Sequence, residues 1–177
     1  MNRFKIPEKS ELTQENQNVY DQVEAQLGFV PNLYTYMAKH DNALPDYLTF
    51  INRKSTLTNK EKEVVSLVVS EINGCNYCLS AHTTLGKMNV FTEAETIEIR
   101  KGNLSFDSKL NALTELTANL VNTRGKADDN ILENFFNAGY SEEQFIDVVF
   151  VIADKIISNF IAVNTKTRID FPLAQSL

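Results

Sequence analysis

Helix and strand signals compete in one stretch of the chain, Thr58-Asn-Lys-Glu-Lys-Glu-Val64-Val-Ser-Leu-Val-Val69. Its paired β-branched valines favour a strand, but the two pairs recur with the four-residue spacing of one helix face. The hydroxyl of Thr58 comes three residues before Glu61, which is the capping-box pattern that starts a helix. Because two signals favour a helix and one favours a strand, residues 59–72 are predicted to be helical.

The same signals recur along the rest of the chain. Further capping boxes begin at Thr92 and Ser141, and Asp128 or Asp129 can start another helix. Glycines fall in the gaps between the helical segments, as expected after helix C-termini. The predicted fold class is therefore all-α, a helical bundle. We expect helices at 13–27, 32–39, 43–52, 59–72, 75–88, 93–100, 108–123, 129–138 and 142–163.

The chain is short enough to form one domain over residues 1–177. Residues 58–71 and 141–154 both run from a capping hydroxyl through acids to an apolar segment, as an internal helical repeat would. Two unrelated buried helices would share this pattern, so both interpretations stay open. Residues 142–163 are apolar in nearly every direction around a helix. We expect this helix to be buried on most sides, in the core or between subunits of a homo-oligomer.

Charge and hydropathy exclude several classes of protein. The net charge of −6 and the isoelectric point near 5.0 argue against nucleic acid or an anionic membrane as the main partner. The apolar stretch 145–163 carries Asp147, Asp154 and Lys155, which a membrane span would not. Residues 1–7 have no apolar segment after their positive charges, so we expect no secretory signal and a cytoplasmic location.

Both cysteines of the chain lie in one motif, Cys75-Asn-Tyr-Cys78, and His82 follows four residues later. Residues three and four apart share one face of a helix, so the two sulfurs and the imidazole can meet there. Two thiols that can form a disulfide, with a base beside them, are the minimal set for thiol redox chemistry. A reducing compartment would not keep so short a loop oxidised for structural reasons, so these cysteines are predicted to be reactive.

The sequence leaves open which cysteine attacks. Asn73-Gly74 is predicted to end one helix, so Cys75 would open the next, where free backbone N–H groups favour an anion. Cys78 has the better placed base, because His82 lies one helical turn beyond it. The helix start therefore favours Cys75 as the more reactive thiol, and the histidine favours Cys78.

A carboxylate on the preceding helix can orient His82, as the third group of a catalytic triad does. Glu63 is twelve residues before Cys75 and is our candidate. Periodicity alone does not distinguish it from Glu61 or Glu71.

A zinc site is the main structural alternative for the two cysteines. Zinc usually takes four ligands in proteins, and the chain offers Cys75, Cys78 and His82, with His40 far away in sequence. We therefore predict no metal site.

Glu63, Cys75-x-x-Cys78 and His82 together resemble the active-site signature of the AhpD-like alkylhydroperoxidases, which belong to the carboxymuconolactone decarboxylase superfamily. The similarity includes Gly28-Phe-Val-Pro-Asn-Leu-Tyr34, a segment frequent in the peroxidase-related branch. It covers most of the chain, and its specific motifs are concentrated in residues 57–86.

This resemblance implies an all-helical homo-oligomer, a trimer or hexamer, that reduces peroxides without haem or metal. Cys78 would match the peroxide-attacking cysteine and Cys75 the resolving one, while His82 and Glu63 would match the proton relay. The implied partners are a peroxide substrate and an external thiol or dithiol-protein reductant. One position departs, because the best-studied branch has a histidine where this chain has Tyr77.

Three other functions remain as alternatives. A general protein disulfide oxidoreductase would use the same residues. The lactone decarboxylase branch acts on a small acid without a cysteine pair, so the intact Cys75-x-x-Cys78 counts against it. A non-enzymatic helical scaffold would carry the motif incidentally.

Overall fold

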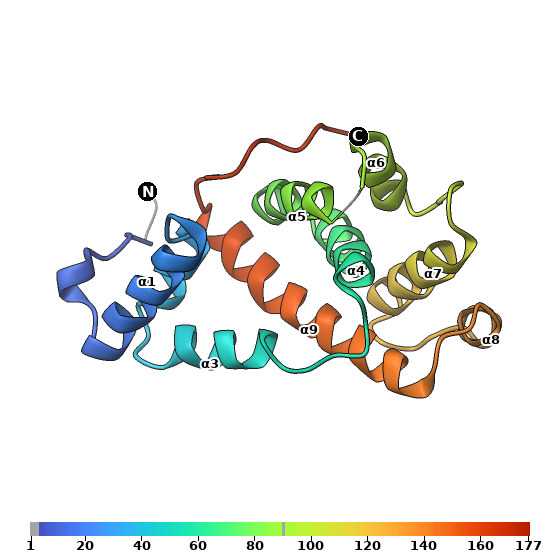
Figure 1. Ribbon diagram of the computed structural model, residues 1–177, viewed down its shortest axis with the longest axis horizontal. Coiled ribbons are helices and arrows are strands. Elements are labelled where there is room, and N and C mark those ends of the chain that lie inside the picture. The colour runs from blue at the N-terminus through green and yellow to red at the C-terminus, as the bar shows by residue number, and fades with distance from the viewer. Residues whose placement is uncertain (1–3, 90) are drawn as a thin grey trace.

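The computed structural model describes residues 4–89 and 91–177, and these residues form helices and no strands (Figure 1). The helices are α1 (Gln14–Leu27), α2 (Asn32–Met37), α3 (Ala43–Ile51), α4 (Asn59–Ile72), α5 (Asn76–Met88), α6 (Glu93–Lys101), α7 (Ser108–Asn122), α8 (Asp129–Asn137) and α9 (Glu142–Thr165). A short 3₁₀ helix, η1 (Lys9–Glu11), precedes them and was not predicted. The all-α prediction is confirmed, and the predicted helices agree with the observed ones to within two residues at each end.

Local capping explains why the helices begin where they do. Complete capping boxes form at Thr58, Thr92 and Ser141, where each hydroxyl accepts a hydrogen bond from the backbone N–H three residues later. Asp128 is the residue before α8, but its side chain makes no capping bond to that helix. Instead, Asp128 Oδ2 accepts a hydrogen bond from Asn119 on α7. The three predicted capping boxes are confirmed.

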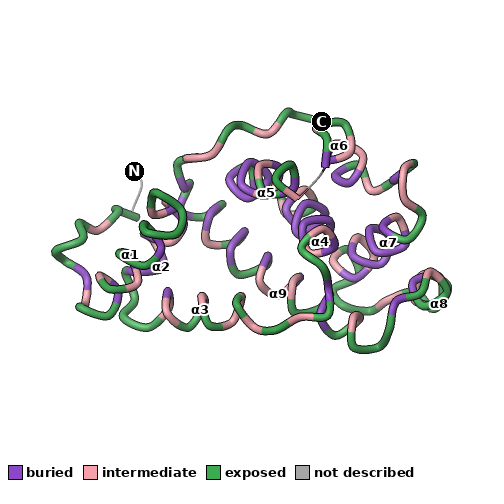
Figure 2. The backbone as a smooth tube through the Cα atoms, viewed as in Figure 1, coloured by how far each residue is buried: buried purple, intermediate pink, exposed green. Residues whose placement is uncertain are grey.

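Helix α4 lies at the centre of the fold and packs against α5, α6, α7 and α9 (Figure 1). Its apolar residues form the main core with α7 and with Val148 of α9, and Figure 2 shows this buried centre. A second apolar cluster joins α1, α2 and α3 to the start of α5, and it includes both cysteines. The cysteine motif therefore lies where the N-terminal helices meet α4 and α5.

For helix α9 the structure of one chain excludes burial on most sides in the core, and burial between subunits stays a prediction. Within one chain it is not buried on most sides, because its polar residues face inward and an apolar stripe faces outward. The buried polar side chains are Asp147, Lys155, Ser158, Asn159 and Thr165. The exposed apolar ones are Ile146, Val149, Phe150, Ile156, Ile157, Phe160 and Val163. The inward residues make specific polar contacts, described below, and these contacts compensate the cost of burying them.

Two further expectations concern membrane-spanning helices and a secretory signal. In the part of the chain that the structure describes, no helix combines the length and the apolar character that a membrane crossing requires. Residues 1–3 lie outside the described residues, so the absence of a secretory signal stays a prediction.

Candidate active site

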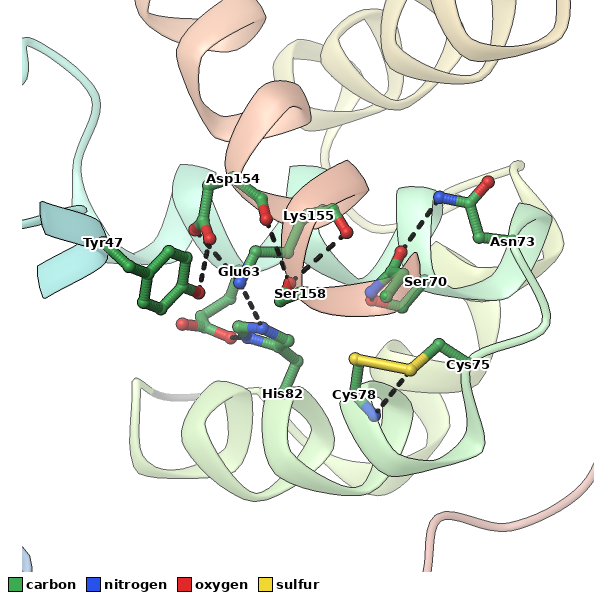
Figure 3. Close-up of polar contacts among 11 residues, drawn as sticks. Tyr47, Glu63, Ser70, Asn73, Cys75, Cys78, His82, Asp154, Lys155 and Ser158 are labelled. Carbon is green, nitrogen blue, oxygen red and sulfur yellow. Dashed lines mark hydrogen bonds and ion pairs between the residues drawn. A yellow bond between two sulfur atoms is a disulfide. The ribbon is translucent and has the colours of Figure 1, made fainter. Parts of the chain in front are cut away.

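Cys75 and Cys78 form a disulfide at the beginning of α5 (Figure 3). Helix α4 ends at Ile72, and Gly74 then takes a positive φ of 63°, a conformation that glycine adopts at little cost. The chain reverses there, and Cys75 becomes the residue that caps α5. Its Sγ accepts a hydrogen bond from the backbone N–H of Cys78 at 3.3 Å. The prediction that Cys75 opens a helix is confirmed.

Helix α9 holds the turn that presents the cysteines. Asn73 Nδ2 donates to Asn159 Oδ1 at 3.0 Å, and Asn159 Nδ2 donates to Ser70 Oγ at 3.2 Å. The backbone N–H of Cys75 donates to the carbonyl of Ser70 at 2.9 Å. Asn159 is completely buried, so these hydrogen bonds tie α9, the end of α4 and the disulfide into one unit.

Both cysteines are buried, with exposed fractions of 1% for Cys75 and 2% for Cys78, but only Cys78 lines a cavity. The cavity has a volume of about 670 Å³ and opens between the N-terminal helices, α5 and α9. Its walls include aromatic and apolar side chains from α2, α3, α9 and the C-terminal segment, namely Leu33, Tyr34, Tyr47, Phe50, Phe150 and Phe171. A small molecule in this cavity would meet the Cys78 end of the disulfide.

A buried carboxylate on α4 holds the imidazole on α5. Glu63 Oε2 lies 2.8 Å from His82 Nδ1, and both side chains are largely buried. Both residues also line the cavity beside Cys78. The structure thus brings together two of the predicted site residues from different helices.

The other two candidate glutamates face elsewhere. Glu61 closes the capping box with Thr58, where its Oε2 accepts from the Thr58 N–H at 2.8 Å. Glu71 forms an ion pair with Arg100 on α6, with 2.7 Å between Oε2 and Nε. Of the three glutamates, Glu63 is therefore the one that contacts the imidazole.

Lys155 on α9 is a site residue that the sequence reasoning missed. Its Nζ lies 2.8 Å from His82 Nε2 and 3.1 Å from Asp154 Oδ2, and its side chain is 7% exposed (Figure 3). The signal was present, because a lysine inside an apolar helical stretch is rarely buried without a partner. From the sequence alone Lys155 argues only against a membrane span, because the sequence does not show which groups face this side chain.

The polar contacts that run from Glu63 through His82 and Lys155 to Asp154, here called the polar chain, continue to Tyr47 on α3. Tyr47 Oη donates to Asp154 Oδ1 at 2.6 Å. Burial, together with the nearby Asp154 carboxylate, raises the pKa of Tyr47 well above its ordinary value. Tyr47 therefore keeps its proton, and Asp154 accepts from Tyr47 on one oxygen while facing Lys155 with the other.

His82 does not contact the cysteines through its ring nitrogens in this disulfide state. Glu63 occupies Nδ1 and Lys155 occupies Nε2. A disulfide has no proton to give, so this geometry leaves the proposed acceptance of a proton from Cys78 as a prediction for the reduced protein.

Tyr77, between the two cysteines, connects α5 to α2 and to the C-terminal segment. Its hydroxyl accepts a hydrogen bond from the backbone N–H of Leu33 at 3.3 Å, and its ring meets Phe171 edge-on with centroids 5.8 Å apart. Burial and the nearby Asp170 carboxylate raise the pKa of Tyr77 above its ordinary value, although the Leu33 bond opposes them. Asp170 also accepts from the Asn32 N–H at 2.6 Å, so Tyr77 lies at the junction of three segments.

The described histidine, cysteine and acidic side chains do not gather into a metal-binding cluster. Across residues 4–89 and 91–177, no group of three or more histidine, cysteine or acidic side chains is placed to hold a metal ion. His40 is exposed, and its Nδ1 accepts from the Asn42 N–H at 3.3 Å.

Residues 38–108, which contain all four predicted site residues, match the model of the carboxymuconolactone decarboxylase family. The uncharacterized protein YdfG of Bacillus subtilis (strain 168) is 24% identical over 102 residues. The matched part covers 56% of this chain and 69% of YdfG.

Solved structures share the whole fold. A peroxidase-related protein from Ralstonia eutropha JMP134, described as an alkylhydroperoxidase AhpD core, superposes with a TM-score of 0.86 at 18% identity. That match covers 95% of this chain and 92% of the other. The debrominase Bmp8 superposes with a TM-score of 0.78 at 18% identity, covering 96% and 93% of the two chains, and a variant of it is known in complex with 2,3,4-tribromopyrrole. At these identities the likeness shows the fold alone.

Proposed function

We propose that this chain, whose residues 38–108 match the carboxymuconolactone decarboxylase family, is an AhpD-like thiol-dependent peroxidase. One observation carries the proposal: a cysteine pair at a helix start, whose Cys78 lines an apolar cavity beside the buried pair of Glu63 and His82. The cavity offers a binding place for an organic peroxide, and the pair offers a base for the thiol. The Cys75–Cys78 disulfide serves as the redox group, so the proposed reaction needs no bound cofactor.

The reaction has two steps and balances without another oxidant. The Cys78 thiolate attacks the O–O bond, so that an S–O bond forms, the O–O bond breaks and an alcohol leaves. The Cys75 thiol then attacks the sulfenic acid on Cys78, which forms the S–S bond and releases water. An external thiol or a dithiol protein supplies the two electrons that reduce the disulfide.

The position of each cysteine supports this division of roles. Cys78 lines the cavity, so a peroxide reaches it first. Cys75 caps α5, where the helix N-terminus favours negative charge on its sulfur. When a reductant attacks Cys78, Cys75 is then the better leaving thiolate, and a stable leaving thiolate speeds disulfide exchange.

The burial of both sulfurs favours a small substrate over a protein disulfide. A general disulfide oxidoreductase has to present its sulfur to a protein surface, as reduction by a dithiol protein also requires, whereas these sulfurs are reached in this structure through a cavity that a small peroxide or a small thiol can enter. The lactone decarboxylase alternative leaves the cysteine pair without a role.

Reductive dehalogenation of an aromatic ring is a second candidate. The aromatic walls of the cavity favour it, and the debrominase Bmp8 shares the fold. Oxidation of two thiols to a disulfide would supply two electrons, halide would leave, and a proton would take its place on the ring.

The test is oxidation of the reduced protein by cumene hydroperoxide, followed by intact-mass analysis. We expect a loss of two hydrogens in the wild type, which marks an intramolecular disulfide. Cys75→Ser should instead accumulate a sulfenic acid on Cys78 that dimedone traps. Cys78→Ser lacks the thiol that lines the cavity, so cumene hydroperoxide should not form a sulfenic acid there. Two free thiols after treatment would overturn the proposal. A brominated pyrrole in place of the peroxide tests the second candidate by bromide release.

We also propose that the chain assembles as a homo-oligomer, a trimer or hexamer, through the outer face of α9. Its exposed apolar residues recur at helical spacing, as a contact stripe does, and include Ile146, Val149, Ile157, Phe160 and Val163. Contiguous exposed apolar surface of this kind marks interaction sites in soluble proteins.

A further inference from the structure

We propose that Lys155 is a further catalytic residue, which delivers to the leaving oxygen of the peroxide the proton that His82 takes from Cys78. This inference rests on the proposed peroxidase function. It assigns an acid to the reaction, where the sequence motif supplies only a base.

Lys155 lies at the junction of the polar chain and the cavity. Its side chain lines the cavity together with Cys78 and His82. An ammonium group has three N–H donors. Among the described residues, Lys155 Nζ has polar partners at His82 Nε2 and Asp154 Oδ2, so one donor remains for a ligand in the cavity.

With Lys155 in its charged form, the contacts fix the position of the other protons. A charged lysine can only donate, so His82 Nε2 must accept and carries no hydrogen. The single ring hydrogen is then on Nδ1 and is donated to the Glu63 carboxylate. In this arrangement His82 is a neutral base. Its Nε2, which carries no hydrogen, lies 2.8 Å from Lys155 Nζ, close enough for a proton to pass between them.

Attack on a hydroperoxide releases a strongly basic oxygen, and an apolar cavity solvates such charge poorly. In the proposed step Lys155 turns its N–H from His82 Nε2 to the leaving oxygen and gives it a proton, while the freed Nε2 takes the proton of the Cys78 thiol. Lys155 then recovers a proton from His82 across their contact. The net change is thiol plus hydroperoxide to sulfenic acid plus alcohol, with no proton gained or lost.

The other two cationic side chains at the cavity, Arg53 and Lys62, are unsuited to this role. Arg53 forms an ion pair with Asp147 and lies over the ring of Phe150, 4.0 Å from its centroid. A guanidinium also does not release its proton in proteins. Lys62 lines the same cavity from α4, but Lys155, and not Lys62, is the lysine that contacts His82.

The test compares two oxidants that differ in their leaving group. Cumene hydroperoxide expels a basic alkoxide that needs a proton, whereas peracetic acid expels acetate, which does not. We expect Lys155→Met to lower the rate of disulfide formation about 100-fold with cumene hydroperoxide and to stay within about threefold of wild type with peracetic acid. Lys126→Met, at an exposed position away from the cavity, is the control and should behave as wild type with both oxidants.

The outcomes separate this inference from the proposed function. If wild type is oxidised but Lys155→Met loses the same factor with both oxidants, Lys155 is only structural and the inference is overturned. If neither oxidant forms the disulfide in wild type, the peroxidase proposal itself fails.

Two further measurements cover the case in which Lys155→Met does not fold. Lys155→Arg keeps the positive charge without an available proton and should show the same selective loss. In wild type alone, rates across a series of hydroperoxides should depend weakly on leaving-group basicity, and a steep dependence would contradict an enzymic acid.

Discussion

His82 Nδ1 lies 2.8 Å from Glu63 Oε2, so a carboxylate on α4 fixes the orientation of the imidazole on α5. Glu63→Gln keeps an oxygen that can accept from Nδ1–H but removes the charge that stabilises an imidazolium. We expect the rate of peroxide-dependent disulfide formation to fall about 100-fold, because general-base catalysis contributes on this scale. Rapid quenching with an alkylating reagent, followed by mass analysis, measures the rate.

Glu61→Gln is the matched control for this prediction. It makes the same chemical change two residues earlier, in a capping box that glutamine also completes. Oxidation of this variant at the wild-type rate is expected, and an equal loss in both variants would contradict a specific role for Glu63.

The stability of the protein should depend on pH through Asp147. Its carboxylate is buried on α9 and accepts hydrogen bonds from Thr56, Arg53 and Ser55. Burial raises the pKa of this carboxyl, but the hydrogen bonds outweigh burial and lower the pKa from 3.8 to about 2. A lowered folded-state pKa stabilises the fold above the unfolded-state pKa, by about 2 kcal/mol here, and this contribution is lost as pH falls from about 4 to about 2.

Asp147→Asn tests this dependence. At pH 7 the free energy of unfolding should fall by about 2 kcal/mol, and the difference from wild type should shrink as pH falls below about 4. Urea unfolding at several pH values measures both. Asp41→Asn, at an exposed position, should leave the curve unchanged. A difference between Asp147→Asn and wild type that stays constant down to pH 2 would exclude the linkage.

The helices could be predicted because their signals are local. The capping hydroxyl of Thr58, the β-branched pairs that follow it and the Asn73-Gly74 break all act within a few residues, and each appears in the structure as expected. The helix-capping position of Cys75 followed from the same local rules.

The rest of the site depends on packing between distant segments. Lys155 and His82 are 73 residues apart, and the periodicity of the sequence does not show which face of α9 packs against α5. Glu63 was the chosen candidate and does contact the imidazole, but periodicity alone could not single it out, because the register between α4 and α5 decides which glutamate faces His82. The sequence did not show that α9 turns a polar face inward, because the apolar residues of this helix outnumber its polar ones.

Tyr77 should hold the C-terminal wall of the cavity in place. Tyr77→Phe keeps the ring against Phe171 and removes the hydroxyl that accepts from the Leu33 N–H. We expect a loss of about 1 kcal/mol in the free energy of unfolding. Hydrogen exchange should become faster at the start of α2 and over residues 167–177. Tyr36→Phe on α2 is the control, and equal exchange in both variants would show that the Tyr77 hydroxyl does not hold this segment.

The outer face of α9 should carry the assembly. Phe160 lies in the C-terminal half of the apolar stripe on α9 and is 56% exposed. A charged side chain at this position would be buried without a partner in any interface that covers it. We expect wild type to elute as an oligomer in size-exclusion chromatography with light scattering, and Phe160→Glu to give a smaller species with an unchanged helical spectrum. Phe136→Glu, at an exposed phenylalanine on α8, should keep the wild-type mass. A monomeric wild type, or an oligomer that Phe160→Glu leaves intact, would place any assembly surface elsewhere.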